Sequence, residues 1–134
     1  MPIHIDVFHP DRIVVCTGRG AISLQEYERF VADLVKADVL HYRKIIDVTA
    51  ATPQGVEREK LADQLLRFNV AFRHLAQAGR GPLAIVADTR QYDIAQAFKG
   101  GTEGERPIEV FSSIHDARKW LAGFPMDEVS RPPR

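Results

Sequence analysis

Three short polar segments each follow an apolar stretch of the sequence, and their residue types could bind an anion. They are Gly18-Arg19-Gly20, residues 47–52 and Asp88-Thr89-Arg90. Ligands of open α/β sheets gather beyond the carboxyl ends of the strands, where helix N-termini present free amide groups. The two arginines would add positive charge. We therefore predict ligand or partner loops at Gly18, Arg19, Gly20, Asp47, Thr49, Asp88, Thr89 and Arg90.

The same segments also have a purely structural interpretation. Ser23, Thr52 and Thr89 are residues that commonly cap helix N-termini, and glycines commonly turn the chain. In this alternative, the three segments connect secondary-structure elements and bind nothing.

Groups that could perform catalysis are sparse. Cys16 stands in an apolar run, where cysteine behaves as a small buried hydrophobe. The sequence contains no nucleophile elbow, no P-loop and no complete dinucleotide fingerprint. We expect no enzymatic activity, no cofactor and no metal site, since no metal-ligand spacing links the five histidines His4, His9, His41, His74 and His115.

Length and composition favour one globular domain. The chain has 134 residues, 45% of them hydrophobic, and 18 basic side chains balance 18 acidic ones. This composition excludes wholesale disorder and argues against a nucleic-acid partner. We expect a domain over residues 1–124 and a flexible tail over residues 125–134, which contain three prolines.

The location is expected to be cytoplasmic. A single cysteine cannot form an intrachain disulfide, which fits a reducing compartment. The first residues lack the cationic start and apolar run of a signal peptide. No apolar stretch approaches the length of a membrane span.

The elements that must position these residues begin with two strands. Apolar residues alternate over residues 3–8, and an apolar run follows at residues 12–17. The short His9-Pro10-Asp11 turn between them predicts an antiparallel hairpin. Gly18-Arg19-Gly20 is expected to end the second strand. The Ser23-Leu24-Gln25-Glu26 segment is typical of a capping box and predicts a helix.

Strands and helices alternate over the rest of the chain. We expect strands at residues 44–48, 82–87 and 108–111, and a loop over residues 49–55. A long helix is predicted over residues 56–78, a third helix after a cap at Asp88 or Thr89, a glycine loop at residues 100–104, and a final helix after Ser113. The order predicts an α/β fold with a mixed five-stranded sheet, an antiparallel N-terminal hairpin, parallel remaining strands and about four helices. Residues 45–48 and 83–87 should be neighbouring parallel strands.

These segments resemble a known family. The run Lys44-Ile45-Ile46-Asp47-Val48-Thr49, the run Leu83-Ala84-Ile85-Val86-Ala87, and Ile108-Glu109-Val110-Phe111 leading into Ala117-Arg118-Lys119-Trp120-Leu121 are similar to the SpoIIAA-like group. That group belongs with the STAS domains and, by fold, with the lipid-binding Sec14 domains. The resemblance covers about residues 3–124 and implies sequential strands in a mixed sheet.

The resemblance also implies a candidate modification site. In anti-sigma-factor antagonists, a partner kinase phosphorylates a serine at the start of the helix that follows the Ile-Asp strand. The Asp-Ser-Ser-Gly pattern of that site is absent here. Thr52 is the nearest hydroxyl by position and Thr49 the second nearest, so these two residues are the candidate phosphoacceptors.

Two functions follow as hypotheses. The first is a non-catalytic STAS-like regulatory or protein-interaction module that binds a protein partner, such as a regulator or kinase, and pairs as a homodimer. The alternative is a carrier for a small apolar or anionic, lipid-like ligand, with a pocket at the carboxyl ends of the strands. The side chains that could line such an apolar pocket are Leu65, Leu66, Phe68, Val70, Phe72 and Phe98.

Overall fold

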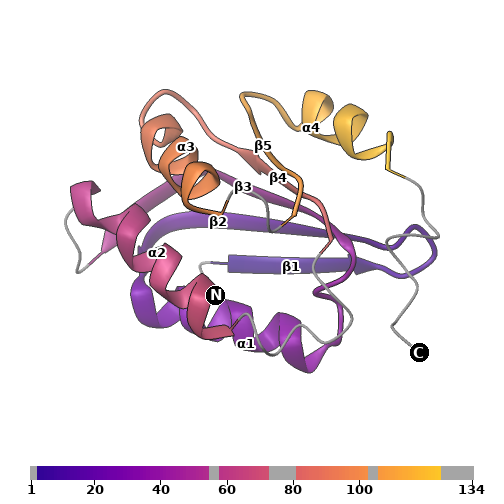
Figure 1. Ribbon diagram of the computed structural model, residues 1–134, viewed down its shortest axis with the longest axis horizontal. Coiled ribbons are helices and arrows are strands. Elements are labelled where there is room, and N and C mark those ends of the chain that lie inside the picture. Colours follow the sequence, from indigo (N-terminus) through magenta and orange to yellow (C-terminus); the bar gives the residue numbers. More distant parts are fainter. Residues whose placement is uncertain (1–2, 55–57, 73–80, 103–105, 125–134) are drawn as a thin grey trace.

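A five-stranded mixed sheet forms the centre of the molecule (Figure 1). The structure, a computed structural model, describes residues 3–54, 58–72, 81–102 and 106–124, with the side chains at positions 53–54, 58–59, 68 and 71–72 left out. The elements in chain order are β1 (Ile3–Phe8), β2 (Ile13–Ser23), α1 (Leu24–Lys36), β3 (Arg43–Gln54), α2 (Arg58–Phe72), β4 (Leu83–Val86), α3 (Tyr92–Gly101), β5 (Ile108–Phe111) and α4 (Ile114–Leu121).

The strands are ordered β1-β2-β3-β4-β5, so each lies beside its neighbour in the sequence. β1 is antiparallel to β2, and the remaining pairs are parallel. Ile45 of β3 pairs with Ala84 of β4, which confirms that these two apolar segments are parallel neighbours. The predicted fold class is therefore confirmed.

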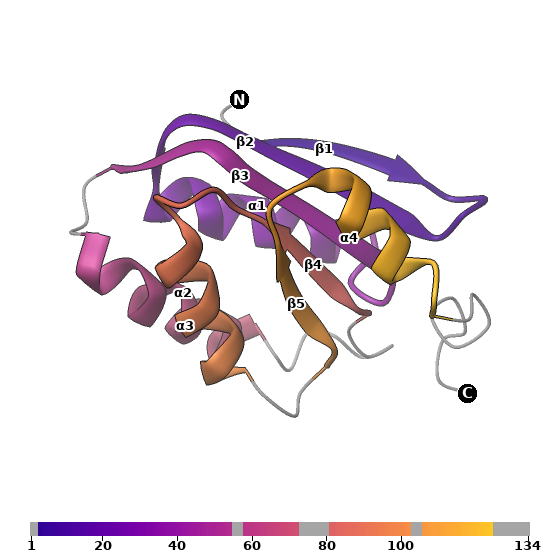
Figure 2. The same cartoon turned by 90° about the horizontal axis from the view of Figure 1, so that it is seen from above.

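Helices cover both faces of this sheet. α1, α2 and α3 lie on one side and α4 on the other (Figure 2). Successive side chains of a strand point to opposite faces of the sheet, so neighbouring residues belong to different core clusters. Cys16 packs in a cluster with Leu34 of α1, whereas its neighbour Val15 packs with Leu121 of α4. β4 is buried along its whole length because helices cover it on both faces.

Two side-chain caps begin helices as the sequence predicts. At α1, the backbone N–H of Glu26 donates to the Ser23 hydroxyl over 3.2 Å, and the Glu26 carboxylate accepts from the backbone N–H of Ser23 over 3.0 Å. This reciprocal pair is a complete capping box. At α4, the Ser113 hydroxyl accepts from the backbone N–H of Asp116 over 3.2 Å.

Two predicted strand ends are wrong. β2 continues through Gly18-Arg19-Gly20 to Ser23, and β3 continues to Gln54, so residues 49–54 are strand rather than loop. The reason is non-local, because the two extensions pair with each other from Arg19 opposite Ala50 onward. A register shift after Thr17 and a positive φ of 70° at Gly20 let the paired strands bend without separating.

The third helix also begins and ends differently from the prediction. Its N-cap is Gln91, not Asp88 or Thr89. The Asp88 carboxylate instead accepts from the backbone N–H groups of Arg90 and Gln91, which forms a turn before the helix. Gly100 and Gly101 are the last residues of α3 and not a loop. The outer parts of the predicted second helix (56–57 and 73–78), position 104 and the predicted tail (125–134) lie outside the described residues.

Candidate binding cavity

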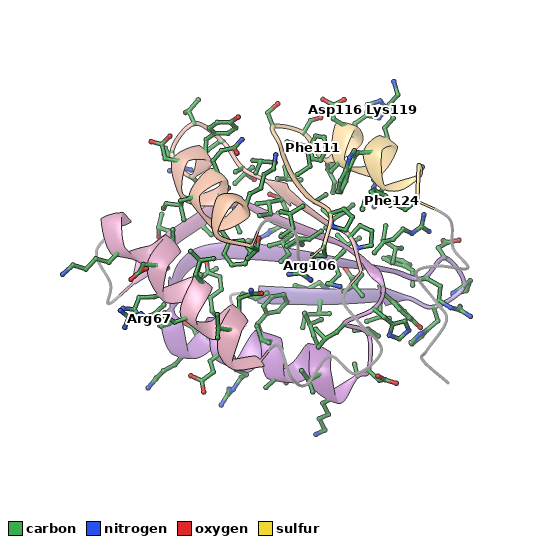
Figure 3. All side chains as sticks on the ribbon, viewed as in Figure 1. Arg67, Arg106, Phe111, Asp116, Lys119 and Phe124 are labelled. Carbon is green, nitrogen blue, oxygen red and sulfur yellow. The ribbon has the colours of Figure 1, made fainter. Side chains whose placement is uncertain are left out.

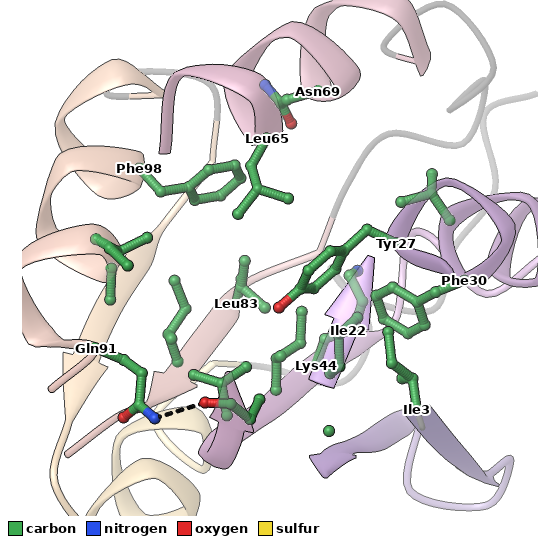
Figure 4. A pocket seen from close by; sticks show the side chains of 18 of the residues that line it. Ile3, Ile22, Tyr27, Phe30, Lys44, Leu65, Asn69, Leu83, Gln91 and Phe98 are labelled. Atoms are coloured by element: carbon green, nitrogen blue, oxygen red, sulfur yellow. Dashed lines mark hydrogen bonds between the residues drawn. The ribbon is translucent and has the colours of Figure 1, made fainter. Parts of the chain in front are cut away.

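A cavity of about 190 Å³ lies between the sheet and helices α1, α2 and α3 (Figure 4). Its floor consists of β3 and β4 side chains, including Ile46 and Ile85. Its walls are side chains from the three helices. They include Tyr27, Phe30 and Leu34 of α1, Leu65 of α2, and Ala95 and Phe98 of α3. The opposite face of the sheet is filled by Trp120 and the rings of Phe111 and Phe124, which lie by α4 (Figure 3).

Small residues from separate elements leave this space open. Gly18 of β2, Ala51 of β3 and Ala95 of α3 all line the cavity. A Cβ at Gly18 would lie 2.9 Å from the Ile22 Cδ1 atom, so a larger residue there would displace the end of the Ile22 side chain. The three residues project little or no side chain into the region that larger residues would fill.

The bulge in β3 shapes the floor of the cavity. From Thr17 to Arg19, β2 advances by two residues, whereas β3 advances by three between Asp47 and Ala50. The extra residue reverses the alternation, so that Val48 and Ala51 both line the cavity. A regular strand would turn one of these two side chains toward the other face.

Apolar side chains dominate the lining, and the polar side chains are mostly engaged already. Lys44 is 2% exposed, and its ammonium donates to the Tyr42 carbonyl over 2.8 Å and to the Leu40 carbonyl. Asn69 and Arg106 each have an interaction partner. Chemically, the space is suited to hydrophobic contact, which contributes about 25 cal/mol for each Å² of apolar surface removed from water.

Gln91 fills a structural role at one end of the cavity. Its amide nitrogen donates to the Ala51 carbonyl over 3.0 Å and to the Thr49 carbonyl over 3.3 Å. Its amide oxygen accepts from the backbone N–H of Asp88 over 3.1 Å. Both ends of the Gln91 amide are therefore used to join β3 to the segment before α3.

Tyr27 and Thr52 are the described polar residues of the lining whose hydroxyls have no hydrogen-bond partner, and Thr52 is exposed at the rim. The Tyr27 ring extends from α1, and its hydroxyl points into the cavity (Figure 4). Among the described residues, this hydroxyl has no hydrogen-bond partner. Burial raises the pKa of the Tyr27 hydroxyl above its ordinary value, so the group is a protonated donor at neutral pH.

Several of the predicted site residues meet at the end of this cavity. We call Asp47, Thr49, Thr52, Asp88 and Arg90 the polar rim. The Arg90 guanidinium donates to the Thr49 carbonyl over 3.0 Å and forms an ion pair with Asp88, also at 3.0 Å. Desolvation raises the pKa of Asp88, but hydrogen bonds from Arg90 outweigh it and lower that pKa overall. The charge of Arg90 is thus already balanced by a carboxylate.

The two candidate phosphoacceptors differ in their surroundings. The Thr49 hydroxyl donates to the Asp47 carboxylate over 2.7 Å, whereas Thr52 is exposed. Thr52 lies in β3 and caps no helix, so its predicted capping role is wrong.

The remaining predicted loop residues lie nearby. Arg19 and Gly20 are exposed on β2 and pair with Ala50 and Ala51 of β3. Thr89 is exposed between the two rim residues Asp88 and Arg90. The structure therefore brings residues 47–52 and Asp88-Thr89-Arg90 together. The segment Gly18-Arg19-Gly20 lies beside residues 47–52 as part of β2.

Cys16 and the histidines form no reactive centre in the described part of the chain. Cys16 is fully buried, and burial raises the pKa of its thiol to about 12. No group of three or more His, Cys, Asp and Glu side chains among the described residues could hold a metal ion. His9 instead bonds to the Tyr42 hydroxyl over 2.7 Å.

Part of the predicted apolar lining is found in the cavity. Leu65 and Phe98 line it, whereas Val70 is 59% exposed and does not, so that prediction is wrong. The lining does not include Leu66, which packs against Gly101. The Phe68 and Phe72 side chains lie outside the described residues. Gln91 and α1 were not among the predicted lining residues, although the apolar face of α1 was a usable signal for Tyr27 and Phe30.

The fold is similar to two solved structures. One is an uncharacterized protein of the DUF3478 family with a SpoIIAA-like fold from Shewanella loihica PV-4, with 18% identity and a TM-score of 0.59 over 89% of this chain and 91% of that one. The other is the anti-sigma factor antagonist SpoIIAA in its unphosphorylated form, with 8% identity and a TM-score of 0.56 over 91% of this chain and 99% of that one.

No family model matches the sequence, and no curated protein matches it significantly. The described helices include none with the length and apolar character needed to cross a bilayer. The structural likeness is to the family that the sequence resembles, and it shows that the chain has a SpoIIAA-like fold.

Proposed function

From the SpoIIAA-like fold and its cavity, we propose that this chain is a non-enzymatic binding module that takes up a small apolar ligand beneath α1, α2 and α3. The observation that carries the proposal is the apolar space of about 190 Å³. Native cores contain few voids larger than a water molecule. This space is partly open to solvent, so its apolar lining is in contact with water when no ligand is bound. A bound ligand would shield this lining from water.

The position of the cavity modifies the carrier hypothesis. The predicted pocket was at the carboxyl ends of the strands, but the cavity runs along one face of the sheet, from Lys44 and Leu83 to Ala51. Its polar rim lies at the carboxyl end. Uptake of an apolar molecule along the sheet face is therefore better supported than binding of an anion at the rim, where Arg90 is paired with Asp88.

The first experiment asks whether the native protein carries a ligand. Native mass spectrometry of the purified chain should detect a small retained mass. Thermal unfolding should then show a higher Tm in the presence of toluene or indole, because a ligand that binds only the folded state stabilises it.

A cavity-filling variant makes this test specific. Ala95→Leu adds bulk inside the cavity, whereas Ala97→Leu adds the same bulk on the exposed side of the same helix. We expect Ala95→Leu to abolish the ligand-dependent rise in Tm and Ala97→Leu to preserve it. Ile94→Phe, also in the lining, replaces Ala95→Leu if that variant fails to fold. Equal rises in Tm for all variants would contradict the proposal, as would no rise in the wild type.

A second candidate function is a STAS-like protein-interaction module. The fold likeness to an anti-sigma factor antagonist favours it, and so does the exposed position of Thr52 on the polar rim. In this proposal, a regulator or kinase binds at the rim, the chain pairs as a homodimer, and Thr52 is the better phosphoacceptor because the Thr49 hydroxyl is engaged by Asp47.

This second function has its own test. Incubation with ATP and cell extract, followed by mass spectrometry, should place phosphate on Thr52, and Thr52→Ala should remove that signal. Sizing chromatography should give the mass of a dimer. A monomer without phosphate on Thr52 or Thr49 would contradict the regulatory proposal and leave the ligand-binding proposal intact.

A further inference from the structure

The polar groups of the cavity define the chemical class of its ligand, provided that the proposed function holds. We propose that the cavity selects an uncharged, mainly apolar molecule with a single hydrogen-bond acceptor, and that the Tyr27 hydroxyl is the group that recognises this acceptor. Tyr27 would thus be the residue that determines specificity, while the apolar lining supplies most of the binding energy.

The volume limits the size of the ligand. An engineered apolar cavity of about 150 Å³ accommodates benzene. The cavity here measures about 190 Å³, which is modestly larger. It suits an aromatic ring with a short substituent, or about nine non-hydrogen atoms. The space is partly open to solvent, so a longer molecule would extend beyond it.

Among the described residues of the lining, the Tyr27 and Thr52 hydroxyls have no hydrogen-bond partner, and only Thr52 is exposed. Gln91 uses both its amide nitrogen and its amide oxygen on backbone groups. Lys44 donates to two backbone carbonyls. The Tyr27 hydroxyl points into the space bounded by Leu65, Leu83 and Phe98, without a protein partner among the described residues (Figure 4).

The surroundings of this hydroxyl favour an uncharged ligand. The Tyr27 hydroxyl is still accessible to solvent, so a ligand acceptor would replace water as its partner. A carboxylate or phosphate would itself have to leave water, and it would need a paired charge in return. The Lys44 ammonium donates to the Leu40 and Tyr42 carbonyls, and Asn69 and Arg106 each have an interaction partner. The Tyr27 hydroxyl is therefore the neutral donor that points into the apolar part of the cavity, away from the exposed Thr52 at the rim.

A matched pair of probes isolates the hydrogen bond. Acetophenone and α-methylstyrene have the same size and shape, but only acetophenone carries a carbonyl oxygen. Calorimetric titration of each probe into the wild type and Tyr27→Phe gives four dissociation constants. We expect Tyr27→Phe to weaken acetophenone binding about fivefold relative to α-methylstyrene, because it removes one hydrogen bond.

The control is a tyrosine on the surface. Tyr92 lies on α3, is 46% exposed and accepts a hydrogen bond from Gln96. Tyr92→Phe should leave the ratio of the two dissociation constants unchanged. An unchanged ratio in Tyr27→Phe, with both probes still bound, would overturn the role of Tyr27 and leave the proposed function standing. Failure of the wild type to bind either probe would overturn both.

Discussion

The amide nitrogen of Gln91 lies 3.0 Å from the carbonyl oxygen of Ala51, so a side chain bonds to the main chain of β3 beyond the end of its pairing with β4. β4 pairs with β3 only as far as Val86 opposite Asp47, and β3 continues beyond this point. Gln91 therefore takes the place of a neighbouring strand along the free edge of β3. It also holds the polar rim against the N-terminus of α3.

Replacing Gln91 should destabilise the fold. Gln91→Ala leaves the carbonyl of the buried Ala51 without its side-chain donor, whereas the Thr49 carbonyl still accepts from Arg90. A buried polar group without a partner costs about 1–3 kcal/mol. Urea unfolding measures the change. Gln96→Ala is the control, because Gln96 bonds only to the Tyr92 hydroxyl near the surface, and it should change stability by less than about 0.5 kcal/mol. Similar losses for both variants would show that Gln91 has no special role.

The capping box at α1 should contribute measurably to stability. Ser23→Ala removes the hydroxyl that accepts from the backbone N–H of Glu26 and should cost about 1 kcal/mol. Gln25 is exposed in the first turn of the same helix, so Gln25→Ala should leave the free energy of unfolding nearly unchanged. Chemical denaturation of the two variants checks this, and a neutral Ser23→Ala would mean that α1 begins without help from its cap.

Cys16 should resist thiol reagents in the folded protein. Burial raises the pKa of its thiol to about 12, so very little thiolate exists at pH 8, and the side chain has no exposed surface. Labelling should be slow until denaturant is added. A cysteine introduced at the exposed Ala50, in a Cys16→Ala background, should react rapidly under the same conditions. Rapid labelling of Cys16 in the native protein would contradict its buried position.

His41 should make the protein less stable in mild acid. Desolvation lowers the pKa of His41 below its ordinary value, Lys44 and Arg12 lower it further, and Asp38 opposes them. The unfolded chain then binds the proton more readily than the folded chain, so stability falls as the pH drops below about 6.5. His41→Gln should flatten this part of the stability profile.

A surface histidine provides the comparison for His41. His115 is exposed on α4, and His115→Gln should leave the pH profile of the wild type unchanged. The free energy of unfolding, measured between pH 5.5 and 7.5 for the three proteins, decides the matter. If the free energy of unfolding of His41→Gln falls as steeply with decreasing pH as that of the wild type, His41 does not cause the loss of stability in mild acid.

The sheet and its helices could be predicted because local patterns determine them. Alternating apolar residues predict a strand with one buried face, as at Ile3, Ile5 and Val7. An uninterrupted apolar run predicts a strand that is buried on both faces, as at residues 83–87. The capping residues Ser23 and Ser113 mark helix starts by short-range hydrogen bonds. Such signals do not depend on the rest of the fold.

The strand extensions and the cavity depend on contacts between distant residues. Gly18 and Gly20 are typical of a strand end, but pairing with β3 keeps them in β2. Three small residues from separate elements, Gly18, Ala51 and Ala95, line the open space, and no one segment of the sequence reveals this. Gln91 resembles any polar residue before a helix, since its partners lie about 40 positions earlier in the chain.

The most direct test of ligand binding is a crystal structure of the protein grown with bromobenzene. The bromine atom locates the molecule by its anomalous scattering. We expect one bromobenzene between the sheet and the helices, in contact with Leu83 and Phe98 and near the Tyr27 ring. A cavity without bromobenzene at saturating concentration, or bromobenzene bound only on the outer surface, would contradict the account.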